Sequence, residues 1–79
     1  MPTTQDIAIL WKSGRQGKSG GSFSTDGADI YSYALKIGYT DDQGNKVAID
    51  YTGKHRYSAT TSKHVSYAKR VADKVVQPD

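Results

Sequence analysis

The sequence of 79 residues contains no cysteine and no glutamate, and it has no long run of apolar residues. Without cysteine the chain can have neither a disulfide bond nor a thiolate metal site. A membrane-spanning helix needs about 20 consecutive apolar residues, and no stretch of this chain approaches that length. Residues 1–6 lack the charged-then-apolar pattern of a secretion signal, so we expect a cytoplasmic protein that does not enter a membrane.

All eight acidic residues are aspartates. Aspartate favours turns and helix caps over helix interiors, so the composition predicts strands and turns with little helix. Charge is spread unevenly around the net value of +3: residues 26–50 contain five aspartates against two lysines, whereas residues 51–79 contain six lysines and arginines. The length fits one small domain spanning residues 1–79.

Alternation of apolar with other residues predicts a β-hairpin whose strands are 30–39 and 47–52. Turn residues separate the two arms, with Gly44 or Asn45 expected to supply a positive φ. One tyrosine-rich face of the hairpin is expected in the core, and it comprises Tyr31, Tyr33, Leu35, Ile37, Tyr39, Val47, Ile49 and Tyr51.

An amphipathic helix at about 62–76 is predicted to cover that face, capped by Thr60, Thr61 or Ser62. Its apolar side is expected to pack through Val65, Ala68, Ala72 and Val75. The predicted fold is therefore α+β: a small antiparallel sheet, the hairpin plus short flanking strands, packed against one C-terminal helix.

Three further segments have weaker patterns. Residues 6–12 are compatible with a strand or a buried turn of helix, and residues 56–59 with a short third strand. Residues 13–22 contain four glycines and two cations, which predicts a flexible Gly/Ser basic loop.

No motif for catalysis, metal binding or cofactor binding stands out. Residues 14–19 are reminiscent of a phosphate-binding loop, but Lys12 takes the place of its first glycine. His55 and His64 lack the i, i+4 spacing of a helical metal pair, and we expect solvated or capping imidazoles. No arrangement of serine, histidine and aspartate singles out a nucleophile. We therefore expect a non-enzymatic protein without metal or cofactor.

The basic side of the predicted helix is the candidate binding surface. Cations recur there around a tyrosine, as in nucleic-acid grooves, and further cations lie just before the helix and in the Gly/Ser loop. An ordinary solvated helix face would show the same pattern. The candidate residues for a partner or nucleic acid are Arg15, Lys18, Lys54, Arg56, Lys63, Tyr67, Arg70 and Lys74.

Two stretches, 31–37 and 57–64, together resemble a family of short uncharacterised proteins of bacteriophages, plasmids and other mobile elements. That family pairs a Ser-Tyr-x-Thr-x-Ile strand with a Tyr-Ser-x-Thr-Thr-Ser-Lys-His stretch. The second motif matches from Tyr57 to His64, and the first departs at Leu35, where the family tends to have threonine. The resemblance covers about residues 25–64 and implies a mobile-element origin, without catalytic residues to carry over.

These features predict a small binding protein that acts in the cytoplasm of a host cell. One hypothesis is a protein that binds and modulates a host protein or defence complex. We favour it slightly, because the acidic central segment would repel a polyanion. The alternative is nucleic-acid binding through the basic helix face and the Gly-rich loop. A virion component is a third possibility, and the oligomeric state is left open.

Overall fold

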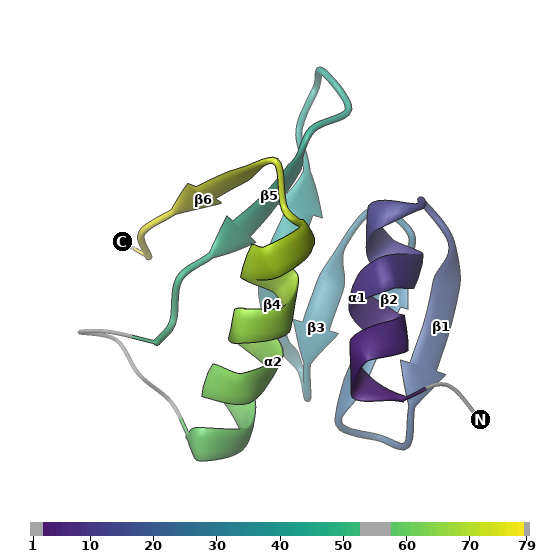
Figure 1. The fold of residues 1–79 in the computed structure, drawn as a ribbon, viewed down its shortest axis with the longest axis vertical. Coiled ribbons are helices and arrows are strands. Elements are labelled where there is room, and N and C mark those ends of the chain that lie inside the picture. Colours follow the sequence, from purple (N-terminus) through teal and green to yellow (C-terminus); the bar gives the residue numbers. More distant parts are fainter. Residues whose placement is uncertain (1–2, 53–57, 79) are drawn as a thin grey trace.

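The computed structural model describes residues 3–52 and 58–78. It consists of a six-stranded sheet with two helices on one face (Figure 1). The α+β fold is confirmed, but two helices rather than one cover the sheet. The elements are α1 (Thr4–Lys12), β1 (Gln16–Ser19), β2 (Phe23–Asp26), β3 (Ile30–Ser32), β4 (Leu35–Thr40), β5 (Lys46–Ile49), α2 (Ala59–Val71) and β6 (Lys74–Val76).

The strands follow one another across the sheet in chain order, from β1 to β6. Neighbours pair antiparallel except β5 and β6, which run parallel because α2 connects them as a crossover. α1 packs on β1 and β2, and α2 packs on β3, β4, β5 and α1. The core therefore lies between one face of the sheet and the helix pair, while no helix of the described chain covers the other face (Figure 1).

α1 begins at a reciprocal cap between Thr3 and Asp6. The Thr3 hydroxyl accepts the Asp6 N–H at 3.3 Å, and the Asp6 carboxylate accepts the Thr3 N–H at 2.9 Å. One side of the helix buries Trp11, whose indole N–H donates to the carbonyl of Ala28 at 3.0 Å. Of the two alternatives for residues 6–12, the helix is therefore right.

α2 starts earlier and ends sooner than the predicted helix at about 62–76. The Ser58 hydroxyl accepts the Thr61 N–H at 3.0 Å, which makes Ser58 the N-cap in place of the later hydroxyls. Residues 58–59 thus open a helix instead of closing a third strand, and residues 56–57 lie outside the described part. Among the residues described, neither helix has the length and apolar character needed to cross a membrane.

Beyond α2 the chain returns to the sheet. The Asp73 carboxylate accepts the N–H of Lys46 at 2.8 Å, and the Asp73 N–H donates to the carbonyl of Lys46 at 2.7 Å. These bonds set β6 beside β5. Val75 and Val76, predicted to lie on the helix, therefore form an edge strand.

The segment predicted as a flexible loop at 13–22 contains β1, paired with β2 along its whole length. Gly17 in β1 lies under α1: a Cβ atom there would be 2.5 Å from Cδ1 of Leu10. The Leu10 side chain therefore packs closely on this glycine, and residues 16–19 form a strand where a loop was predicted.

The predicted strand 30–39 is broken by a turn at Tyr33 and Ala34. Tyr33 has φ +57°, a left-handed conformation that a bulky residue rarely adopts, and its side chain is 57% exposed. The tyrosine is therefore a turn residue and not part of the core.

A register shift interrupts the antiparallel pairing of β3 with β4. Ile30 lies opposite Gly38, but Tyr31 lies opposite Lys36, which leaves Ile37 as the extra residue of a β-bulge. Both Ile37 and its neighbour Gly38 are buried. The single alternating face predicted for residues 31–39 therefore does not exist.

The core draws on both helices and the middle of the sheet. The sequence pattern correctly placed Ile37, Val47, Val65 and Ala68 in the core, but Trp11 and Phe23 were not among the predicted core residues. The pairing of β4 with β5 confirms the inner part of the hairpin. The buried hydrophobic cluster comprises Ile7, Trp11, Phe23, Ile30, Ile37, Ala48, Val65 and Ala68.

Candidate functional site

The basic residues predicted for binding are distributed over different sides of the molecule. Arg15 and Lys18 belong to the β1 end of the sheet, whereas Lys74 lies on β6 at the opposite edge. Lys54 and Arg56 lie outside the described residues. The structure therefore does not bring the predicted helix face and the predicted loop together as one surface.

On α2, Lys63, Tyr67 and Arg70 follow at spacings of four and three residues and share one stripe of the helix. Lys63 and Arg70 are exposed. The guanidinium carbon of Arg70 lies 5.4 Å from the centre of the Tyr67 ring, within cation–π range. One face of that ring is thus already occupied, which reduces its value as a stacking platform for a base.

Ion pairs remove Lys74 from the set of available cations, because its ammonium lies 3.4 Å from the Asp41 carboxylate. Lys46 is buried, and its ammonium donates at 2.7 Å both to the Gly27 carbonyl and to the Thr40 hydroxyl. Within the described chain, the exposed cations that form no ion pair are Arg15, Lys18, Lys63 and Arg70.

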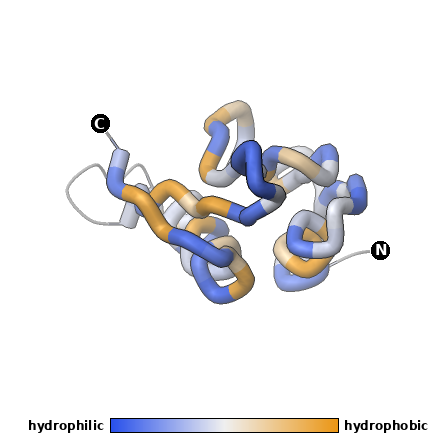
Figure 2. The backbone as a smooth tube through the Cα atoms, turned by 90° about the horizontal axis from the view of Figure 1, so that it is seen from above, coloured by the Kyte–Doolittle hydropathy of each residue, from blue (hydrophilic) through white to orange (hydrophobic). Residues whose placement is uncertain are grey.

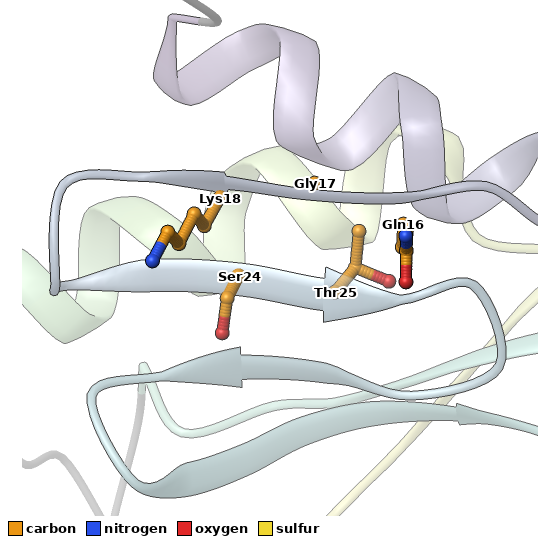
Figure 3. Close-up of a pocket in the computed structure, with 5 residues that line it drawn as sticks. All are labelled: Gln16, Gly17, Lys18, Ser24 and Thr25. Carbon is orange, nitrogen blue, oxygen red and sulfur yellow. The ribbon is translucent and has the colours of Figure 1, made fainter.

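The uncovered face of the sheet carries a polar row across four strands. The register places Lys18 beside Ser24, Ser24 beside Tyr31, and Tyr31 beside Lys36. The neighbours of Ser24 and Tyr31 along their strands are buried toward the helices, so these side chains face the other way. A pocket of about 420 Å³ adjoins the row and is lined by Gln16, Gly17, Lys18, Ser24 and Thr25 (Figure 3).

The charge of this row is partly neutralised. The Lys36 ammonium lies 3.1 Å from the Asp29 carboxylate, and the Tyr31 hydroxyl donates to the same carboxylate at 3.2 Å. Hydrogen bonding and attraction to Asp29 raise the pKa of Lys36 above its ordinary value. The row therefore offers one unpaired ammonium, that of Lys18.

β6 forms an apolar edge of the sheet. Val75 is 45% exposed and Val76 37%, and Figure 2 shows hydrophobic residues close to the C-terminal end, at the margin of the molecule. The Val76 carbonyl accepts the N–H of Asp50 at 2.8 Å, so the peptide groups of Val76 face β5. Successive residues turn their peptide groups to opposite sides, and the N–H and C=O of Val75 therefore face the outer edge.

A pocket of about 460 Å³ lies beside β6. Its wall combines the uncovered ends of β4, β5 and β6 with the segment that follows β6. The residues that line it are Tyr39, Ile49, Tyr51, Val76, Gln77 and Pro78. A hollow lined by aromatic, aliphatic and polar groups thus borders the exposed edge.

Asp50 fixes the geometry of this corner. Its carboxylate accepts the hydroxyl and, at 3.1 Å, the N–H of Thr52, the ammonium of Lys69 at 3.3 Å and the amide of Gln77 at 3.4 Å. The Thr52 hydroxyl is the main cause that lowers the pKa of Asp50 to about 2, against the opposing effect of burial. The charge beside the pocket is therefore satisfied within the molecule.

The other edge of the sheet, β1, is different in kind. Its sequence Gln-Gly-Lys-Ser has no large apolar side chain, and Gln16 and Lys18 are exposed. A lysine on a short polar edge strand disfavours pairing with another chain. Lys74 gives β6 a lysine too, so the two edges differ mainly in their other side chains: β1 is polar, whereas β6 carries two exposed valines.

His64, expected at the surface or as a cap, is buried with 3% of its area exposed. Its ring stacks on Phe23 with centres 4.2 Å apart, and its Nδ1 lies 2.7 Å from the Ser32 hydroxyl. Burial is the first cause that lowers the pKa of His64, and the charge of Lys63 adds to it. These contacts could not be predicted from the sequence around His64, because they join β2, β3 and α2, which are far apart in the chain.

Among the described residues, no three histidine, cysteine, aspartate or glutamate side chains group together as a metal site requires. The surfaces above present exposed valines on an edge strand and cations without an ion pair in the described chain. Compared with known proteins, the chain matches no protein-family model, no curated protein and no solved structure.

Proposed function

We propose that this chain is a non-enzymatic binding protein whose partner is another protein, docked at β6 and the pocket beside it. The observation that carries the proposal is the exposure of Val75 and Val76 on an edge strand. Exposed apolar side chains on an edge strand promote pairing with another chain. A partner protein that covers Val75 and Val76 would bury these exposed side chains in an interface.

An extended segment of the partner fits the chemistry of this edge. Such a strand would pair with the outward N–H and C=O of Val75, and its alternate side chains would enter the pocket beside Tyr39 and Ile49. Backbone hydrogen bonds would supply affinity, and the shape of the pocket would select side chains.

Electrostatics favour a protein over a nucleic acid at this edge. Lys74 is paired with Asp41, and Lys69 with Asp50. Nucleic-acid binding depends on cations that neutralise phosphates, and this corner has none without a carboxylate among the described residues.

The resemblance to mobile-element proteins leads us to propose a host-cell protein, such as a component of a defence complex, as the partner. Residues 58–64 of the stretch that carries the resemblance form the N-cap and the first turns of α2. α2 in turn brings the chain back to form β6 beside β5, so the proposed edge depends on this stretch. A small accessory protein would modulate such a complex in the cytoplasm by occupying one of its segments.

Two substitutions of one residue test the docking edge. Val75→Pro removes the outward N–H, whereas Val75→Thr keeps it together with the branched shape. We expect immobilised wild-type protein to retain a host protein after nuclease treatment of the lysate, and Val75→Pro to weaken that binding by about tenfold or more. Val75→Thr should weaken it less.

Both variants should melt as the wild type does in circular dichroism, because neither change removes a bond to β5. A partner that binds Val75→Pro as tightly as the wild type would place the interface elsewhere. A partner lost on nuclease treatment would favour nucleic acid.

A second candidate function is binding of single-stranded nucleic acid on the uncovered sheet face. The observation that favours it is the row that places Tyr31 between Lys18 and Lys36, since bases stack on sheet-borne aromatics flanked by cations. Fluorescence anisotropy with a random single strand at low and moderate salt tests it. Salt-sensitive binding that Lys18→Ala weakens and Lys63→Ala leaves unchanged would support this site, and no binding at low salt would dismiss it.

A further inference from the structure

The imidazole of His64 joins three elements at the N-terminal half of α2. Its ring lies parallel to that of Phe23 in β2, with an angle of 1° between the planes, and Nδ1 contacts Ser32 in β3. Ser32 also bonds Thr61, one turn earlier on α2, with 3.1 Å between the two hydroxyl oxygens. All three polar residues of this cluster are buried, so the cluster fastens the helix to the sheet.

The hydrogen bonds satisfy one nitrogen of the neutral His64 ring. The Ser32 hydroxyl lies 2.7 Å from Nδ1 and also bonds Thr61, and a hydroxyl can donate one hydrogen and accept another. Nδ1 is therefore hydrogen-bonded whichever ring nitrogen carries the proton.

The surroundings disfavour a second proton. Phe23 covers one face of the ring, the Tyr33 ring lies 6.3 Å away at 45°, and Ser32 and Thr61 are uncharged. The one charged group that acts on His64 is the ammonium of its neighbour Lys63, and no carboxylate of the described chain compensates for it. Stacking on Phe23 would attract an imidazolium, but this attraction is smaller than the cost of burying an unpaired charge.

We propose that His64 is a pH-sensitive latch, which holds the N-terminal half of α2 on β2 and β3 at neutral pH and releases it in mildly acidic solution. The released helix would uncover Phe23, a fully buried apolar ring. The latch contacts lie on β2 and β3, and β4 separates β3 from the β5–β6 pair in the sheet, so the latch and the docking edge use different residues.

The direction of the pH effect follows from the environment of the ring. Burial and Lys63 hold the pKa of His64 in the folded protein below its ordinary value of 6.5. Below that pH the unfolded chain binds the proton and the folded chain resists it, so stability falls as the solution becomes more acidic. Where the folded protein stays unprotonated, each pH unit below 6.5 lowers the folding equilibrium constant by about tenfold.

Denaturation of two matched proteins measures this effect. His55→Gln removes the other histidine and serves as the background, and His55→Gln/His64→Phe also removes the latch while keeping a ring against Phe23. We expect the background protein to lose up to about tenfold in its folding equilibrium constant between pH 7.5 and 5.5. The double variant should lose less than about twofold. Equal losses in the two proteins would overturn the proposal.

Nuclear magnetic resonance of the His55→Gln protein provides a test that does not depend on how the Phe variant folds. At pH 7.5 we expect a neutral His64 ring, and a titration midpoint below 6.5. The amide shifts of Phe23, Ser32 and Thr61 should follow that titration, while the indole N–H of Trp11 keeps its shift. A midpoint at or above 6.5 would contradict the latch.

Discussion

Single residues decide how closely the helices approach the sheet. Gly38 in β4 lies beneath the indole of Trp11, and a Cβ atom there would be 2.7 Å from Cγ2 of Ile30 and 2.9 Å from Cζ2 of Trp11. Gly17 in β1 lies against the tip of the Leu10 side chain. In a sequence these glycines are indistinguishable from turn glycines, which is why the close approach of α1 could not be predicted.

Gly38→Ala tests this packing. The added methyl group must displace Ile30 or Trp11, so we expect a loss of about 1–3 kcal/mol in the free energy of unfolding. Gly21→Ala is the matched control, because a Cβ atom there meets nothing within 4 Å and its backbone has no positive φ. Chemical denaturation should show a change within about 0.5 kcal/mol for Gly21→Ala. Similar values for both variants would contradict the packing of Trp11 on β4.

His64 shows why site residues are harder to predict than elements. Next to Lys63, and with few apolar neighbours in the sequence, a histidine is expected at the surface. The contacts that bury it come from Phe23 and Ser32, which lie 41 and 32 residues earlier in the chain. Only a correct arrangement of β2, β3 and α2 would have revealed them.

At the scale of elements, the sequence predicted those features that neighbouring residues stabilise, such as turns and helix caps. The turn between β4 and β5 contains Gly44 with φ +82°, as its sequence indicated, and a hydroxyl residue caps α2. Two adjacent valines are too few residues to distinguish the period of a helix from that of a strand, so Val75 and Val76 fit both. Asp73, through its bonds to Lys46, decides for the strand. For α1, the Thr3–Asp6 pair was a usable signal, since it matches a capping box.

β1 yields a prediction for hydrogen exchange. Because residues 16–19 pair with β2, the amides of β1 that point into the sheet should exchange slowly. Gly20 and Gly21, in the turn after β1, are the internal reference. We expect alternate amides of β1 to exchange at least on the order of tenfold more slowly than these glycines. Equal rates along residues 16–21 would mean that β1 is not part of the sheet in solution.

The corner formed by β5, α2 and the segment after β6 yields a prediction for acid. Asp50 is 17% exposed, and its pKa of about 2 lies below the ordinary 3.8 of an unfolded chain. A carboxylate with a lowered pKa contributes stability that is present above pH 4 and is lost as the pH falls toward 2. The contribution is about 2 kcal/mol at most.

Urea denaturation of the wild-type protein and of the Asp50→Asn variant measures the contribution of the Asp50 carboxylate to stability. The asparagine keeps an acceptor for Thr52 but does not titrate. We expect the difference in the free energy of unfolding between the two proteins to shrink from pH 4 to pH 2 and to stay constant between pH 5 and pH 7. A difference that does not change below pH 4 would show that Asp50 is not held in its charged form by these contacts.

For the whole molecule, the fold class followed from composition and alternation, whereas the relative positions of the candidate binding residues did not. Those candidates were drawn from the predicted helix and from the Gly/Ser loop. Pairing of β1 with β2 places Lys18 on the sheet, and β6 carries Lys74 to the opposite edge beside Asp41. Because residues 74–76 were predicted as helix, Val75 was expected in the core, whereas both valines are exposed on the proposed docking edge.

The central claim, that a protein partner docks on β6, is tested most directly by hydrogen exchange of the free protein and of its captured complex. In the free protein the Val75 N–H faces the outer edge, so it should exchange fast. In the complex this amide should become one of the most strongly protected, while amides near Lys18 and along the stripe of Lys63 and Arg70 keep their rates. Protection on β1 or on α2, with an unchanged rate at Val75, would contradict the account.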